Sequence, residues 1–171
     1  MSGTYRWKHG APRVVFITGG SSGIGRDMAR RLAAEGADIA LFNRSAAEDV
    51  LAELRAAARQ PAQRFACYRA DVAQAGSIEV AVHQAVAELG APDLAINSAV
   101  VIHARPLEEA SAQDFDRVID INLKGSRNFA AAVLPHLRPG SHLVFVASLA
   151  ALTGNFAYTA YCASKFGVRG L

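Results

Sequence analysis

Short runs of apolar, β-branched residues alternate along the chain with longer segments in which apolar residues recur at helical spacing. A continuous apolar run predicts a strand buried on both faces, whereas the longer segments predict amphipathic helices. The strands are expected at residues 13–18, 38–42, 65–69, 93–97 and 142–147. The helices are expected at residues 23–35, 46–59, 76–89 and 111–134, and a last helix begins near Tyr158.

Residues that begin or end helices stand at the borders of these segments. Gly36 is expected to stop the first helix, and Ser45 is a plausible N-cap of the second, which closes before Pro61. Ser111 is expected to cap the fourth helix. The alternation of strands and helices predicts an α/β fold with a parallel sheet covered on both faces. Right-handed crossovers then give a doubly wound, Rossmann-type sheet that binds ligands at the carboxyl ends of its strands.

The composition fits a single globular domain. Of 171 residues, 51% are hydrophobic and 19% are charged, and no apolar run approaches the roughly 20 residues of a membrane span. We expect a flexible tail over residues 1–12, which is polar and no secretory signal, followed by a domain over residues 13–171. Because the last helix reaches Leu171 without a capping residue, we expect the C-terminal part of the domain to be missing and the fifth strand to be a sheet edge.

Charge and cysteine content indicate which ligands and binding sites to expect. The net charge of +3 suits an anionic ligand, but the Lys and Arg residues are scattered, so a nucleic-acid-binding surface is not expected. Cys67 and Cys162 are far apart and form no CxxC pair. Neither a disulfide framework nor a metal site is expected, and the cytoplasm is the expected location.

A glycine-rich octet, Thr18-Gly19-Gly20-Ser21-Ser22-Gly23-Ile24-Gly25, joins the first predicted strand to the first helix. Glycine lets the backbone turn tightly and approach a pyrophosphate, and the N-terminus of the helix offers free N–H groups and a positive dipole. The alternative is a plain strand-to-helix turn. The strand before the octet and the helix after it favour phosphate binding.

The form TGxxxGxG resembles the short-chain dehydrogenase/reductase family. The resemblance covers residues 13–171 and implies that Gly19, Gly23 and Gly25 cradle the adenosine and pyrophosphate of a nicotinamide cofactor. The wider set of cofactor-binding residues expected in this octet is Thr18, Gly19, Ser21, Ser22, Gly23, Ile24 and Gly25.

The end of the second strand reads Phe42-Asn43-Arg44 and carries no acid. An acid there would bind the ribose hydroxyls of NAD and repel a 2′-phosphate, whereas Arg44 offers a forked cation suited to that phosphate. Asn43 and Arg44 therefore favour NADP(H) over NAD(H), the alternative being that Arg44 is a solvated loop residue. Asp71 and Val72 follow the third strand, where the resemblance implies a contact with the adenine. A turn or N-cap role for Asp71 is the alternative.

Tyr161 and Lys165 are four residues apart, which places them on one face of a helix. A phenol is a poor base at neutral pH, but a neighbouring ammonium favours the phenolate. A tyrosine tuned in this way can exchange a proton with a carbonyl or alcohol oxygen. Tyr158 lacks such a partner, because the residue four positions later is Cys162.

Two further residues match the family's catalytic pattern. Ser148 follows the fifth strand, and its spacing to Tyr161 implies that its hydroxyl orients the substrate oxygen. Asn122 lies inside the long fourth helix, and the resemblance implies that it holds a water that continues the proton relay from Lys165. The resemblance also implies that Lys165 binds the nicotinamide ribose. The alternatives are a strand-end cap for Ser148 and a helix kink or polar surface position for Asn122.

The segment after the fourth strand departs from the family. It reads Asn97-Ser98-Ala99-Val100 where Asn-Asn-Ala-Gly is usual. Asn97 and Ala99 match and are expected beside the cofactor. Val100 replaces a glycine that the resemblance places against the cofactor, so either a shifted backbone or a narrower pocket is expected, with weaker cofactor binding rather than none.

Together these residues predict an NADP(H)-dependent oxidoreductase that interconverts a ketone and a secondary alcohol, with NAD(H) as the other possible cofactor. The competing hypothesis is a non-catalytic dinucleotide-binding or scaffold protein of the same fold. The run over residues 157–171 is similar to reductases of long-chain 3-keto lipid bases within the family. The resemblance also implies a homodimer or homotetramer.

Overall fold

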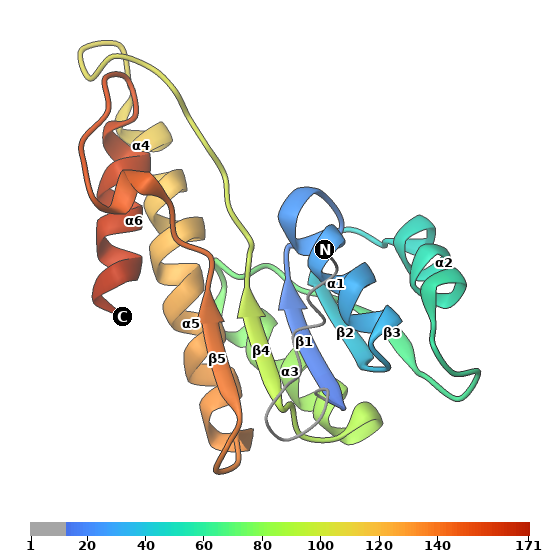
Figure 1. Cartoon of the computed structure of the whole chain (residues 1–171). Helices are drawn as coiled ribbons and strands as arrows, with labels where there is room; N and C mark the ends of the chain where they lie inside the picture. Colours follow the sequence, from blue (N-terminus) through green and yellow to red (C-terminus); the bar gives the residue numbers. More distant parts are fainter. Residues whose placement is uncertain (1–12) are drawn as a thin grey trace.

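The computed structural model describes residues 13–171, so the predicted tail over residues 1–12 lies outside the described residues. The strands form one parallel sheet in the order β3-β2-β1-β4-β5, with β3 and β5 at its edges (Figure 1). Their bounds are Val14–Thr18 (β1), Asp38–Asn43 (β2), Phe65–Arg69 (β3), Leu94–Asn97 (β4) and His142–Phe145 (β5). The predicted edge position of the fifth strand is confirmed within this sheet.

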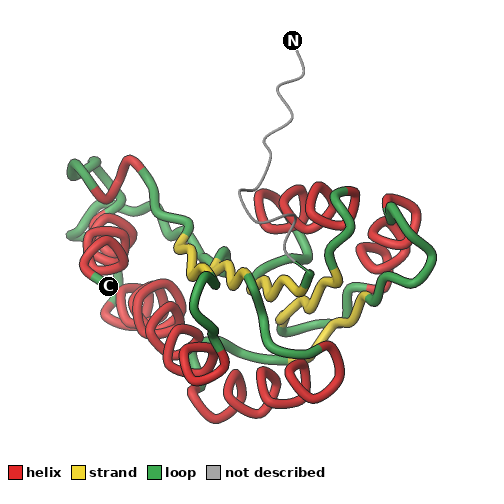
Figure 2. The backbone as a smooth tube through the Cα atoms, turned by 60° about the horizontal axis from the view of Figure 1, so that its bottom comes forward, coloured by secondary structure: helices red, strands yellow, loops and turns green. Residues whose placement is uncertain are grey.

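Helices cover both faces of the sheet, which appears in Figure 2 as a layer of strands between them. Alternate residues of β1 enter different cores: Val15 and Ile17 pack toward α1 and α2, whereas Val14 and Phe16 pack toward α3 and α5. The helix bounds are Gly23–Ala34 (α1), Glu48–Ala57 (α2), Ala75–Leu89 (α3), Ala112–Ile119 (α4), Gly125–Val133 (α5) and Thr159–Gly170 (α6). The doubly wound fold is therefore confirmed.

The predicted long fourth helix is interrupted by a different helical turn. Ser111 caps it as expected, since its Oγ accepts a hydrogen bond from the N–H of Asp114. A π-helical turn at Asp120–Lys124 separates α4 from α5. Such turns insert an extra residue into an α-helix and occur frequently at functional sites. Here the turn contains Asn122.

The borders of two other elements differ from the expected ones. The prediction of Ser45 as the N-cap of α2 was wrong, because the helix begins at Glu48, after Ala47. No side chain caps this end, but Glu48 and Asp49 place negative charge at the positive end of the helix dipole. β5 ends at Phe145, two residues before the expected end. Gly36 ends α1 as expected, with a left-handed φ of 105°.

The described part of the chain lacks a membrane-spanning helix and a cluster of metal-binding side chains. Within residues 13–171 no helix has the length and apolar character needed to cross a membrane. The same residues contain no group of three or more His, Cys, Asp or Glu side chains that could hold a metal ion. Cys67 and Cys162 are both free thiols.

The loop between β5 and α6 contains a residue in an unfavourable backbone conformation. Ala157 has a φ of 64°, in the left-handed region that favours glycine, and its carbonyl accepts a hydrogen bond from the N–H of Arg105 at 2.8 Å. We expect Ala157→Gly to raise the free energy of unfolding by about 1 kcal/mol, because the Cβ strain is removed.

Chemical denaturation would measure this change, with Ala87→Gly as the matched control. Ala87 is exposed inside α3, where the same substitution should lower the free energy of unfolding by about 1 kcal/mol. A loss of stability in both variants would contradict the strain at Ala157.

Candidate active site

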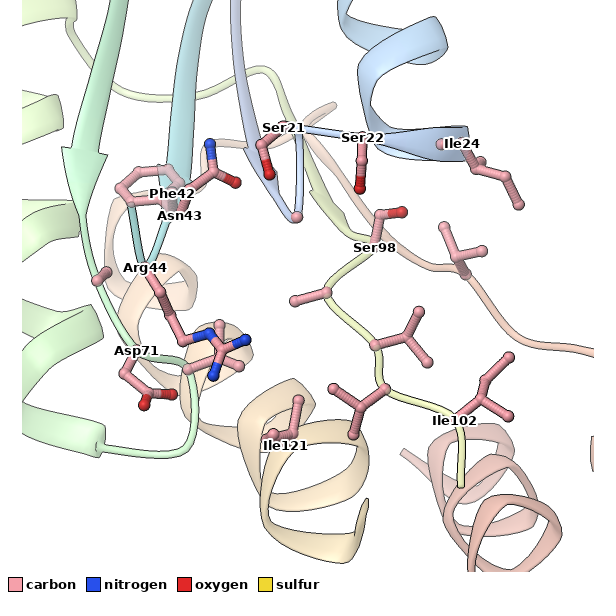
Figure 3. Close-up of a pocket in the computed structure, with 18 of the residues that line it drawn as sticks. Ser21, Ser22, Ile24, Phe42, Asn43, Arg44, Asp71, Ser98, Ile102 and Ile121 are labelled. Carbon is pink, nitrogen blue, oxygen red and sulfur yellow. The ribbon is translucent and has the colours of Figure 1, made fainter. Parts of the chain in front are cut away.

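A cavity of about 430 Å³ opens at the carboxyl ends of the strands (Figure 3). This is where ligands bind in open parallel sheets. It brings together predicted site residues from five separate segments of the chain. Those that line it are Gly19, Ser21, Ser22, Gly23, Ile24, Asn43, Arg44, Asp71, Val72, Ala99, Tyr161 and Lys165.

The glycine-rich octet at residues 18–25 leaves the N-terminus of α1 free to bind an anion. The N-cap residue, Ser22, makes no side-chain cap, and the first turn of the helix carries no acid. Gly23 has a φ of 51° and open space where a Cβ would lie, so backbone N–H groups are accessible from the cavity. A Cβ on Gly19 would lie 2.7 Å from Cα of Ala99, so glycine is required for the close approach of these two segments. These features fit a bound pyrophosphate.

Thr18 and Asn97 lie beneath the cavity and do not line it. The Thr18 hydroxyl donates to Asn97 Oδ1 at 2.8 Å and accepts from the N–H groups of Ser98 and Ala99 at 3.1 Å each. Asn97 Nδ2 donates to Ser126 Oγ at 2.8 Å. Thr18 and Asn97 are buried, so this network fixes the ends of β1 and β4 relative to each other.

A neighbouring part of the cavity wall is formed by the residues at the ends of β2 and β3. Arg44 is exposed, and its guanidinium extends into the cavity beside Asp71 and near Ile121 (Figure 3). Asn43 is only 5% exposed, yet its Oδ1 has no hydrogen-bond partner among the described residues. Leaving such an oxygen unsatisfied costs about 1–3 kcal/mol. The orphaned oxygen therefore fits a ligand that carries a hydroxyl group.

Asp71 has a structural contact of its own. Its Oδ1 accepts a hydrogen bond from the N–H of Ala73 at 3.0 Å, as the turn alternative expects. Asp71 also lines the cavity, together with Val72. The turn contact and the predicted contact with an adenine are compatible, and the second stays a prediction.

Tyr161 and Lys165 both line the cavity from α6, one turn apart. The Lys165 ammonium is buried, donates to the carbonyl of Val146 at 2.6 Å, and lies 5.8 Å from the centroid of the Tyr161 ring. Burial lowers the pKa of Lys165 below its ordinary value. Tyr158 is not among the residues that line the cavity, which agrees with its exclusion on sequence grounds.

Ser148 directly follows Val146 and Ala147, two residues after the end of β5 that line the cavity. It caps a short 3-10 helix at Leu149–Ala151, where its Oγ accepts from the N–H of Ala150 at 3.2 Å. The strand-end cap that was the alternative for Ser148 is therefore present. Because the hydroxyl accepts in this contact, its hydrogen remains available for donation to a substrate oxygen.

Asn122 is 2% exposed, so the alternative of a polar surface position is wrong. Its Oδ1 accepts from the N–H of Val101 at 2.9 Å, and its Nδ2 donates to the carbonyl of Val101 at 2.9 Å and to Ser164 Oγ at 3.1 Å. The π-turn thus ties the loop after β4 to α6. Since the side chain is occupied by these bonds, the predicted relay water would have to bind at the backbone of this turn.

The sequence reasoning missed two buried serines in this network. Ser126 Oγ donates to the carbonyl of Asn122 at 2.5 Å, and Ser164 Oγ donates to the carbonyl of Tyr161 at 2.7 Å. Their spacing was a usable signal, since a serine four residues after Asn122 or three after Tyr161 can reach those carbonyls. The contact of Val146 with Lys165 could not be predicted from residue type, because Val146 binds Lys165 through its backbone carbonyl and not through its side chain.

Val100 lines the cavity, as its position after β4 predicted, and is 43% exposed. It is not among the described non-glycine residues with a positive φ, so the backbone here does not require glycine. The departure from the family pattern therefore adds a branched side chain to the cavity wall without backbone strain. Weaker cofactor binding stays a prediction.

The chain is similar to known oxidoreductases over nearly its whole length. D-threitol dehydrogenase of Mycolicibacterium smegmatis is 40% identical over 93% of this chain and 61% of its own length. 3-Dehydrosphinganine reductase of Arabidopsis thaliana is 38% identical over 93% of this chain and 48% of its own length. The second relative agrees with the predicted likeness to reductases of long-chain 3-keto bases. The chain spans only about half to two thirds of these relatives.

Solved structures agree with this similarity. Levodione reductase superposes with a TM-score of 0.86 at 34% identity, over 92% of this chain and 62% of that one. A blue fluorescent protein from a metagenomic library in complex with NADPH gives 0.84 at 34% identity, over 92% and 65%. The family described as short chain dehydrogenase matches residues 13–171. The chain therefore belongs to the short-chain dehydrogenase family.

Proposed function

We propose that this protein interconverts a ketone and a secondary alcohol, with NADP(H) preferred over NAD(H) and Tyr161 as the general acid/base. The observation that carries the proposal is that Tyr161 and Lys165 line the same cavity as the uncapped N-terminus of α1. A helix N-terminus suits a pyrophosphate, and a tyrosine beside an ammonium suits proton transfer. One cavity therefore contains both residues suited to binding a dinucleotide and residues suited to proton transfer to a carbonyl group.

The arrangement of the cavity supports an extended dinucleotide. Its pyrophosphate would bind at Gly23 and Ile24, its adenosine end would lie toward Asn43 and Arg44, and its reactive end would lie toward Tyr161. When bound, the nicotinamide cofactor supplies or accepts the hydride. This chain's own residues bind the cofactor, orient the substrate and move the proton.

Proton transfer is assigned to the residues around α6. In the direction of reduction, the Tyr161 hydroxyl gives its proton to the substrate oxygen, and the Lys165 ammonium stabilises the phenolate that remains. The hydroxyl of Ser148 donates a second hydrogen bond to that oxygen and orients it. The backbone at Asn122 would hold the water that returns a proton through Lys165. In the direction of oxidation, Tyr161 takes the proton from the alcohol.

A panel of ketones with NADPH tests the proposal, together with calorimetric binding of NADPH. Binding accompanied by turnover is the expected result. Binding without turnover on any ketone of the panel would favour the non-catalytic dinucleotide-binding or scaffold protein. The names of the two relatives indicate different substrates, a sugar alcohol and a long-chain base. The panel should therefore include both polar and long-chain ketones.

The cofactor preference rests on Arg44. We expect Arg44→Ala to weaken NADPH binding at least about tenfold, because a charge-assisted bond to the 2′-phosphate is lost, and to leave NADH binding within about twofold. Dissociation constants for the two cofactors measure this effect. Arg69→Ala is the matched control, because Arg69 is exposed on the neighbouring strand and does not line the cavity. An equal loss for both cofactors in Arg44→Ala would contradict the preference for NADP(H).

We extend the proposal to a cytoplasmic homodimer or homotetramer. Phe115 on α4 and Phe166 on α6 are 37% and 46% exposed, which supports burial of these helices in an assembly. Light scattering of the purified protein would test it, and a monomer at micromolar concentration would contradict it.

A further inference from the structure

Charged and apolar side chains line different sides of the active-site cavity. Arg44 and Asp71 lie together on one side, whereas Ile102 lies on the other (Figure 3). Ile102 belongs to the loop after β4 and is 60% exposed, so it presents an apolar surface to a ligand in the cavity. A ligand that covers this side chain with hydrocarbon gains the free energy of burying apolar area.

Hydrogen bonds hold the loop after β4 against α6 and the segment before it. Asn122 Nδ2 donates both to the carbonyl of Val101 and to a serine hydroxyl of α6. Farther along the loop, the N–H of Arg105 donates to the carbonyl of Ala157, two residues before α6 begins. Ile102 lies between these two contacts. It therefore belongs to the part of the cavity wall next to α6, the helix that carries the proposed acid/base.

This stretch of the loop offers a ligand hydrocarbon rather than hydrogen bonds. Both polar backbone groups of Val101 are bonded to the side chain of Asn122. The polar side chain that follows Ile102 is His103, which does not line the active-site cavity and whose Nδ1 lies 3.0 Å from Asp114 Oδ1. A substrate hydroxyl placed against Ile102 would therefore lose its hydrogen bonds to water without gaining a partner there, which is unfavourable.

We propose that Ile102 is a specificity-determining residue, which makes the site prefer ketones with an apolar chain over polyhydroxylated ketones. The proposal rests on the ketone–alcohol function proposed above and names its substrate class. The apolar chain lies against Ile102 while the carbonyl oxygen lies at Tyr161. The preference therefore affects kcat/KM for the ketone and leaves cofactor binding unchanged.

A series of methyl ketones from 2-butanone to 2-octanone, with NADPH as the reductant, tests the inference. In the wild type, kcat/KM should rise about fourfold for each methylene that reaches Ile102, which is the effect of burying one methylene. The polar comparison is 1,3,4-trihydroxy-2-butanone, which has as many non-hydrogen atoms as 2-heptanone. We expect kcat/KM to be at least about tenfold higher for 2-heptanone than for the trihydroxy ketone.

Substitutions of Ile102 separate its polarity from its size. In Ile102→Asn the rise per methylene should fall below about twofold, and the preference for 2-heptanone should fall at least about tenfold. Ile102→Thr keeps the β-branch, adds a hydroxyl and should act in the same direction. Ile102→Leu keeps an apolar side chain of the same volume and should retain the preference. Calorimetry should give NADPH dissociation constants within about twofold of the wild-type value for all three variants.

Val80→Asn is the matched control for the polar substitutions. Val80 is 59% exposed on α3 and does not line the cavity, so this variant should keep the wild-type preference. Thermal unfolding of each variant shows whether the fold is intact.

The possible outcomes distinguish this inference from the proposed function. A preference for 2-heptanone that persists in both Ile102→Asn and Ile102→Thr would overturn the role of Ile102 and leave the oxidoreductase function standing. Reduction of the trihydroxy ketone by the wild type as efficiently as 2-heptanone would do the same. Absence of turnover on every ketone by a folded wild type would overturn this inference together with the proposed function.

Discussion

Tyr161→Phe is expected to lower kcat by at least about 100-fold while NADPH binds as in the wild type. The phenol oxygen is the one group in the proposed mechanism that exchanges a proton with the substrate oxygen, and general acid/base catalysis contributes about 10²–10⁴ to a rate. Phenylalanine keeps the ring that lines the cavity and removes only the hydroxyl. The free energy of cofactor binding should therefore change little.

Tyr158→Phe is the matched control for this substitution. Tyr158 lies one turn before Cys162, and its ring centroid is 6.2 Å from that of Tyr161, but it does not line the cavity. Its kcat should stay within about twofold of the wild-type value. Steady-state kinetics and NADPH calorimetry on both variants give the comparison. Substantial turnover by Tyr161→Phe would rule out Tyr161 as the acid/base.

The elements of the fold could be predicted because each carries a strong local signal. β1 and β2 are continuous apolar runs, and their residues are buried on both faces of the sheet. The doubly wound arrangement followed from connection rules rather than from any single residue. The N-cap of α2 could not be predicted in this way. Ser45 has the right side chain, but the helix begins three residues later without a side-chain cap.

The parts of the site that the sequence could predict are those defined by side-chain type and spacing. Gly19, Gly23, Tyr161 and Lys165 belong to patterns whose chemistry requires those residues, and they line one cavity. The orientation of Asn43 could not be predicted, because it depends on a contact with a residue 24 positions away on another strand. Spacing along one chain segment carries no information about such a contact.

The structure excludes one of the roles that the sequence allows for Asn122. In sequence it could be a surface position, a kink or a water ligand. The π-turn places it inside the protein, where its side chain bonds Val101 and Ser164. The loop after β4 and the helix that carries Tyr161 are therefore held by one amide. The position of the acid/base relative to the cavity depends on a residue that does not line the cavity itself.

Lys165→Met should lower kcat strongly while it changes the free energy of unfolding little. Methionine has a similar length but no charge, so the phenolate of Tyr161 loses its stabilising ammonium, and kcat should fall by about 10²–10⁴. NADPH affinity should fall as well, if Lys165 binds the nicotinamide ribose. The free energy of unfolding at pH 7 should stay within about 1 kcal/mol of the wild-type value, because a buried charge is removed together with its bond to Val146.

The pH dependence of unfolding gives an independent test of the same substitution. Burial lowers the pKa of Lys165 in the folded protein below its ordinary value of about 10.5, so the unfolded chain binds more protons between these two pKa values. The wild type should therefore gain stability from Lys165 as the pH rises through that window, and Lys165→Met should lack this gain. Denaturation of both proteins from pH 7 to pH 10 measures the difference. A wild type that gains no stability relative to Lys165→Met over this range would show that burial does not destabilise the Lys165 ammonium.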